Sequence, residues 1–130
     1  TQNPTLDGIF MASELMATAV NAQLRTAGLD AAVGAEGSVI RVAIDGTPQG
    51  LQLIREGALD ATVSQPLSAY ATKTADLIEL VSGGGTIEIG PRDDGRVVAT
   101  DVGPQYQLNA TLVTADNVDS DDLWANKIGQ

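Results

Sequence analysis

The sequence contains no cysteine and no histidine, and only 3% of its 130 residues are aromatic. Without cysteine the chain has no disulfide framework, no thiolate nucleophile and no cysteine-bound zinc or iron–sulfur site. Without histidine it lacks the commonest general base and metal ligand. We therefore expect that the protein is not an enzyme and that it holds no metal and no cofactor.

Long hydrophobic runs are also missing, because no apolar stretch approaches the roughly 20 residues of a membrane-spanning helix. The chain begins at Thr1 without a methionine and shows no signal peptide. We expect a processed or truncated product. Hydrophobic residues make up 43% of the sequence, so Val, Ile, Leu and Ala must form the core in place of aromatic side chains. This composition favours helices packed on a sheet.

Basic residues are scarce as well. Seven lysines and arginines stand against 17 acidic residues, which gives a formal net charge of −10. The acids occur in both halves of the chain. A surface of this sign repels nucleic-acid phosphates and anionic lipids, so we expect no nucleic-acid partner.

The first two thirds of the chain alternate strand-like and helix-like patterns. Apolar, β-branched runs predict strands, and apolar residues at spacings of three and four predict helices. Ser13 is placed to cap the first helix, and Thr47 with Pro48 is typical of a helix start. The predicted elements are strands 6–11, 39–44 and 59–64 and helices 15–27, 48–56 and 67–81.

After Gly85 the pattern changes to short strands separated by turns, predicted at 86–89, 96–102 and 110–114. The alternating part predicts βαβ crossovers and a parallel sheet. The expected fold class is therefore α/β.

Polar residues stand at the carboxyl ends of the three predicted parallel strands. They are Ser13 and Glu14 after the first strand, Asp45 after the second and Gln65 after the third. Open parallel sheets bind ligands at that edge, and a hydroxyl, a carboxylate and a carboxamide suit a neutral, hydroxyl-rich molecule. Each residue also has a structural interpretation: Ser13 as a helix cap, Asp45 as a turn residue and Gln65 as the residue before Pro66.

Four segments, in order along most of the chain, resemble the type I periplasmic sugar-binding proteins of the ribose-binding kind. The same family includes the ligand domains of LacI-type repressors. The segments are Asn3-Pro4-Thr5-Leu6-Asp7-Gly8-Ile9-Phe10, Val42-Ala43-Ile44-Asp45-Gly46-Thr47-Pro48, Ile54-Arg55-Glu56-Gly57-Ala58-Leu59-Asp60-Ala61-Thr62-Val63-Ser64-Gln65 and Thr111-Leu112-Val113-Thr114-Ala115-Asp116-Asn117-Val118-Asp119.

The resemblance implies that Asp45 and Gln65 contact a sugar. Ser13 occupies the position of the family's usual asparagine and Glu14 that of the following aspartate, so the resemblance does not fix which sugar is bound. It also implies an incomplete two-lobe architecture of the periplasmic-binding-protein kind. Residues 1–65 and 109–130 would belong to the second lobe and residues 66–108 to the first.

By the same resemblance, the protein would capture a monosaccharide by hinge closure and deliver it to the membrane permease subunits of an ATP-binding-cassette importer. Its location would be periplasmic, or extracytoplasmic and membrane-tethered. The opening half of such a protein is absent, so helix 67–81 would lack most of its packing partners. We expect a missing N-terminal fragment or a second copy of the chain to cover it.

Two other functional classes remain as alternatives. A ligand-sensing domain of a LacI-type transcription regulator would share the fold, but it normally accompanies a basic DNA-binding headpiece, and this sequence contains no basic segment of that kind. A carboxylate-based hydrolase needs two acids that face each other, and the sequence nominates no such pair. The acidic run from Asp116 to Asp122 lacks the glycine and distal glutamate of a calcium loop, which favours a solvated turn.

Overall fold

A computed structural model of the chain describes residues 5–128. Asn3 and Pro4, the start of the first resemblance segment, lie outside the described residues. The chain divides into two compact units. Unit 1 comprises Thr1–Gln65 and Thr111–Gln130, and unit 2 comprises Pro66–Ala110. The assignment of these segments to two lobes of a larger protein stays a prediction.

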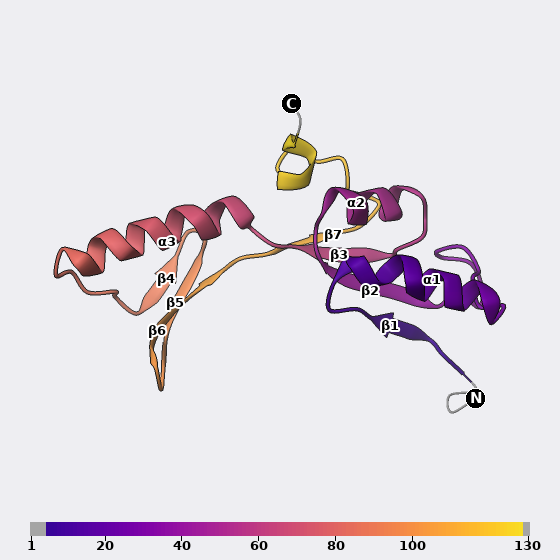
Figure 1. Cartoon of the computed structure of the whole chain (residues 1–130), viewed down its shortest axis with the longest axis horizontal. Helices are drawn as coiled ribbons and strands as arrows, with labels where there is room; N and C mark the ends of the chain where they lie inside the picture. The colour runs from indigo at the N-terminus through magenta and orange to yellow at the C-terminus, as the bar shows by residue number, and fades with distance from the viewer. Residues whose placement is uncertain (1–4, 129–130) are drawn as a thin grey trace. The chain divides into compact units, whose positions relative to one another are not determined.

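Unit 1 contains a sheet of four strands in the order β1-β2-β3-β7 (Figure 1). Strands β1, β2 and β3 run parallel, as the alternating pattern predicts, and β7 pairs antiparallel with β3. The fold is therefore mixed α/β with a sheet that contains parallel strands. The strands are β1 (Gly8–Phe10), β2 (Ile40–Asp45), β3 (Ala61–Ser64) and β7 (Thr111–Val113).

Two helices connect the parallel strands of unit 1. Helix α1 (Ala17–Thr26) follows a 3₁₀ turn, η1 (Glu14–Met16). The start of the predicted helix 15–27 is therefore a 3₁₀ turn, and the α-helix begins at Ala17. Helix α2 (Pro48–Arg55) begins as predicted, because the Thr47 hydroxyl accepts a hydrogen bond from the Gly50 amide. A second 3₁₀ turn, η2 (Trp124–Lys127), lies near the end of the chain.

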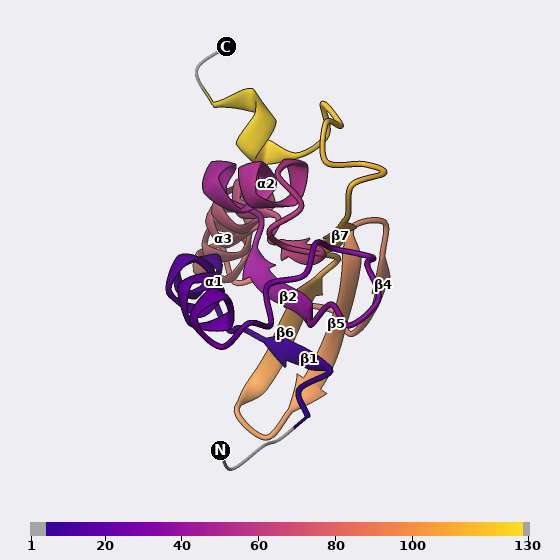
Figure 2. The ribbon, with the colours of Figure 1, turned by 90° about the vertical axis from the view of Figure 1, so that its right-hand side faces the viewer.

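The hydrophobic core of unit 1 lies on one face of its sheet. Right-handed crossovers put α1 and α2 on the same face, beside the strands (Figure 2). Along β2, Ala43 is 1% exposed whereas Ile40, on the opposite face, is 56% exposed. The core is formed by Met11, Ala17, Ala43, Leu51, Ile54, Leu59, Val113, Val118, Leu123 and Ala125.

The opposite face of the same sheet carries exposed apolar side chains. Phe10 and Leu112 are 65% and 61% exposed, and they share this face with Ile40 according to the strand register. Parallel sheets in proteins are usually covered on both faces. This face therefore differs from the usual arrangement of a parallel sheet.

Unit 2 combines one helix with a three-stranded antiparallel sheet in the order β4-β5-β6. Helix α3 (Leu67–Ser82) matches the prediction within one residue. The strands are β4 (Gly90–Arg92), β5 (Gly95–Thr100) and β6 (Gly103–Leu108). The predicted strand at 86–89 is wrong, and β6 was not predicted, because its sequence GPQYQL lacks the apolar alternation that marks a strand.

Unit 2 buries little apolar surface. Val97 is its only buried hydrophobic residue, and the structure describes every residue of this unit. Helix α3 has no buried residue, and Ile78 and Val81 are 62% and 53% exposed. Within residues 5–128, none of the helices is long and apolar enough to span a bilayer.

Candidate functional site

Asp45 ends strand β2 in a backbone conformation that residues other than glycine rarely adopt. Its φ angle is 129°, and the following Gly46 has a φ of 72°. A side chain at Gly46 would collide with Ser64, because an added Cβ atom would lie 2.4 Å from the Ser64 Cβ. The turn therefore requires glycine at position 46, because its backbone lies too close to Ser64 for any side chain. Strained φ angles of this kind concentrate at functional sites.

Three of the four predicted site residues meet at the Asp45 carboxylate. The Ser13 hydroxyl donates a hydrogen bond of 2.7 Å to Oδ2 of Asp45, and the Gln65 side-chain amide donates one of 2.8 Å to Oδ1. The backbone amide of Gln65 also donates to the Asp45 carbonyl at 3.1 Å. All three side chains are half-buried. We call Ser13, Asp45 and Gln65 the polar rim.

Glu14 does not belong to the polar rim, which corrects the expectation that it contacts a ligand. Its side chain is 0% exposed. Its carboxylate accepts hydrogen bonds from the amides of Gly46 and Thr47, at 2.9 and 2.8 Å, and from the Thr47 hydroxyl. These donors precede helix α2, where an anion is stabilised by the helix dipole and by unpaired amides. Glu14 therefore holds the turn that follows Asp45.

Gly50 provides the space for this buried carboxylate. A Cβ atom added at Gly50 would lie 1.9 Å from Cδ of Glu14. Sequence spacing gave no sign of this arrangement, because Glu14 and its partners in the turn are 32 and 33 residues apart. The structural interpretation of Ser13 as a cap is confirmed, since its hydroxyl also accepts from the Leu15 amide at 3.3 Å and caps η1.

The polar rim offers mainly hydrogen-bond acceptors. Each Asp45 carboxylate oxygen accepts one hydrogen bond within the rim and keeps further lone-pair capacity. The Ser13 hydroxyl donates its proton to Asp45, so it can only accept a hydrogen bond from any other group. Among the described residues, none of the salt bridges involves Asp45, so its charge is not neutralised by a lysine or arginine. Such a group binds donors: hydroxyls or protonated amines.

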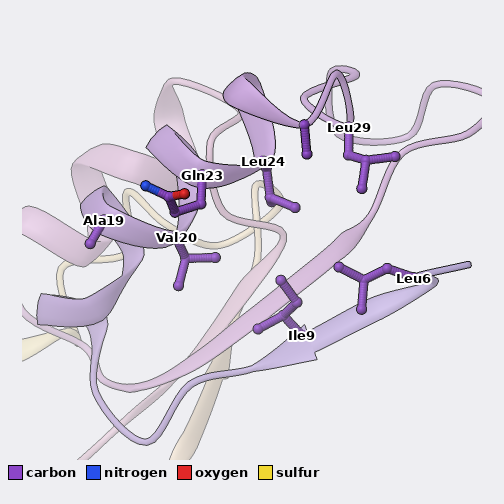
Figure 3. A pocket seen from close by; sticks show the side chains of 8 residues that line it. Leu6, Ile9, Ala19, Val20, Gln23, Leu24 and Leu29 are labelled. Carbon is purple, nitrogen blue, oxygen red and sulfur yellow. The ribbon is translucent and has the colours of Figure 1, made fainter. Parts of the chain in front are cut away.

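An apolar hollow of about 490 Å³ lies elsewhere in unit 1, between α1 and β1 (Figure 3). In this view, Val20 and Leu24 point from the helix toward the strand, and Ile9 points back toward the helix. Gln23 is the only polar residue in its lining. None of the polar-rim residues lines this hollow. The two features are separate, and the apolar one does not suit a sugar.

Unit 2 contains a cluster of charged and aromatic groups that the sequence did not reveal. Asp94 accepts a hydrogen bond from the Tyr106 hydroxyl and forms a 3.1 Å salt bridge with Lys73, whose ammonium lies 5.7 Å from the Tyr106 ring centre. The Tyr106 hydrogen bond lowers the pKa of Asp94, and the same bond raises the pKa of Tyr106. Hydrogen bonding to Asp94 also raises the pKa of Lys73.

The acidic run near the end of the chain forms turns. Asn117 donates its side-chain amide to the Leu112 carbonyl and accepts from the Thr114 amide, which fixes the first turn. Arg55 of α2 binds this segment through Asp119 at 2.8 Å. Within residues 5–128, no three acidic side chains converge on a position that could hold a metal ion.

Comparisons with known proteins add no assignment to this geometry. A scan against protein-family models and a search of curated protein sequences both found no match.

Proposed function

We propose that the chain is a solute-binding protein whose polar rim holds a hydroxyl-rich small molecule, most simply a monosaccharide, without transforming it. The observation that carries this proposal is the Asp45 carboxylate, fixed from both sides by Ser13 and Gln65 at the carboxyl edge of parallel strands. Ligands of open parallel sheets bind at that edge.

The chemistry of the rim favours binding over catalysis. Asp45 is held by two hydrogen bonds and a strained backbone, so little ordering is needed when a ligand arrives. The Ser13 hydroxyl contacts a carboxylate, and the chain has no histidine to activate it as a nucleophile. A rim of this kind retains its ligand by hydrogen bonds alone.

The uncompensated charge of Asp45 also defines the class of ligand. A sugar carboxylate or phosphate would meet an anion with no basic side chain in the rim. A neutral sugar can donate two hydroxyl protons to Asp45, and an amino sugar can donate an ammonium group. The proposal therefore covers neutral sugars and amino sugars and excludes acidic ones.

The resemblance to type I periplasmic sugar-binding proteins extends this proposal to the whole protein. Capture of the sugar by hinge closure, delivery to the permease subunits of an ATP-binding-cassette importer and a periplasmic location are what it implies. The support for this extension is the set of four matching segments. One of them contains Asp45, and another ends at Gln65. The periplasmic-binding-protein fold is part of the same proposal.

Calorimetric titration of the chain with pentoses, neutral hexoses, an amino sugar and a sugar acid tests the proposal. We expect at least one neutral or amino sugar to bind and the acid not to bind. Asp45→Asn should weaken binding by about 10- to 100-fold, because a hydrogen bond to a charged group contributes about 1.5 to 3 kcal/mol.

The matched control is Glu56→Gln, which removes an exposed acid at the end of α2, outside the polar rim. It should bind the sugar as the unaltered chain does. The proposal is wrong if no sugar in the panel binds, or if Asp45→Asn binds as tightly as Glu56→Gln.

A further inference from the structure

The turn at the polar rim carries two acids and no basic side chain. Asp45 is half-buried. The buried carboxylate of Glu14 binds the amides of the next two residues, Gly46 and Thr47. All seven lysines and arginines of the chain lie within residues 5–128, and none of them forms a salt bridge there with either acid. The negative charge of Asp45 is therefore available to a ligand.

The basic residues are engaged elsewhere in the chain. Four of them form salt bridges with other acids: Arg25 with Asp30, Arg41 with Asp60, Arg55 with Asp119 and Lys73 with Asp94. Two more, Arg92 and Arg96, donate hydrogen bonds to acceptors within unit 2. Their positive charges are therefore not part of the polar rim.

The start of helix α2 does not supply a positive field to the rim either. Pro48 has no amide hydrogen, and the amides of Thr47 and Gly50 bind the Glu14 carboxylate and the Thr47 hydroxyl. Glu14 thus places a negative charge at the helix terminus that would otherwise favour an anionic ligand. The rim and its surroundings favour a cation.

The hydrogen-bonding capacity of the rim indicates the same kind of group. Both donors to the Asp45 carboxylate, the Ser13 hydroxyl and the Gln65 amide, are uncharged, and each carboxylate oxygen keeps a further lone pair. The Ser13 hydroxyl can then only accept from a ligand. A protonated amine carries three N–H donors, no acceptor and a positive charge, so it matches these acceptors and also compensates the charge.

We propose that the ligand of the polar rim is an amino sugar whose ammonium group binds the Asp45 carboxylate. This inference rests on the proposed function and narrows its ligand from neutral and amino sugars to amino sugars alone. The net charge of −10 also attracts a cationic ligand. A divalent cation fits less well, because no three acidic side chains converge on one position within residues 5–128.

The expected selectivity follows from the strength of charge-assisted hydrogen bonds. Such bonds are about twice as strong as bonds between neutral groups. An amino sugar should therefore bind about tenfold more tightly than its parent sugar, in which a hydroxyl replaces the ammonium group. A tenfold difference corresponds to about 1.4 kcal/mol.

Calorimetric titration of the chain with matched pairs of sugars tests this selectivity. The pairs are glucosamine with glucose, galactosamine with galactose and mannosamine with mannose, at about pH 6, where the amines are protonated. We expect at least one amino sugar to bind about tenfold more tightly than its parent. Neutral sugars that bind as tightly as their amino counterparts would overturn this inference and leave the proposed function standing. If no sugar binds, the proposed function fails as well.

A charge change in the protein shows whether Asp45 is the source of the selectivity. In Asp45→Asn the ratio of the two affinities should fall to about one, and in Glu56→Gln, outside the rim, it should stay at about ten. Circular dichroism checks that both variants are folded. A ratio that survives Asp45→Asn would overturn the inference.

Two measurements on the unaltered chain separate a specific site from general attraction of cations. Ethylamine carries the charge without the sugar ring, and it should bind much more weakly than the amino sugar. Added salt should weaken binding of the amino sugar and leave that of the neutral sugar unchanged, because salt screens only the charged pair. Ethylamine binding as tight as that of the amino sugar, or equal salt dependence of the two sugars, would overturn the inference.

Discussion

Removal of the Glu14 carboxylate is the perturbation that tests most directly how the polar rim is built. In Glu14→Ala the amides of Gly46 and Thr47 lose their acceptor, and the Thr47 hydroxyl loses its partner. Gly46 is buried and Thr47 is half-buried, so water replaces the carboxylate poorly. The turn that carries Asp45 should loosen.

The expected cost follows from these contacts. Each buried polar group left without a partner costs about 1 to 3 kcal/mol. Two backbone amides lose a charged acceptor, one of them fully buried, which gives a destabilisation of about 2 to 4 kcal/mol. Since small domains are stable by only about 5 to 15 kcal/mol, this is a large fraction of the total.

Urea unfolding followed by circular dichroism measures the effect. We expect a lower midpoint concentration of urea and an unchanged dependence of the unfolding free energy on urea concentration. Glu14→Gln keeps one acceptor oxygen and should lie between Glu14→Ala and the unaltered chain. The matched control is Glu36→Ala, which removes an exposed loop acid and should stay within about 0.5 kcal/mol. If Glu14→Ala is less than 1 kcal/mol from this control, the carboxylate does not hold the turn as argued.

Further predictions concern the two units separately. Gly50→Ala should destabilise unit 1 by about 1 to 3 kcal/mol, because its Cβ would collide with Glu14; an unchanged urea midpoint would contradict the packing. Asp94→Asn should bring the pKa of Tyr106 down toward its usual value in a spectrophotometric titration, whereas Asp93→Asn should not. Because the pKa of Asp94 is lowered in the folded chain, its stabilisation is present above the unfolded carboxyl pKa and is lost as pH falls through the folded one. Acid should therefore lower the urea midpoint more in the unaltered chain than in Asp94→Asn. An equal fall of the urea midpoint with pH in the two proteins would refute this.

The sequence by itself determined the parallel βα units of unit 1. The β-branched run before Asp45 and the Thr47-Pro48 start of α2 are local signals, and the structure contains both. Consecutive parallel strands bring their carboxyl ends to one edge, which is why Asp45 and Gln65 could be expected to meet. Helix α3 also followed from local periodicity.

Only the tertiary structure decided the features that depend on distant contacts. The burial of Glu14 requires a turn and a glycine more than 30 residues away, so spacing could not separate it from its neighbour Ser13. The register of β4, β5 and β6 depends on pairing between strands with weak apolar patterns, which explains the wrong strand at 86–89. Local propensity is read from neighbours in sequence, whereas burial and strand pairing are set by which distant residues come together.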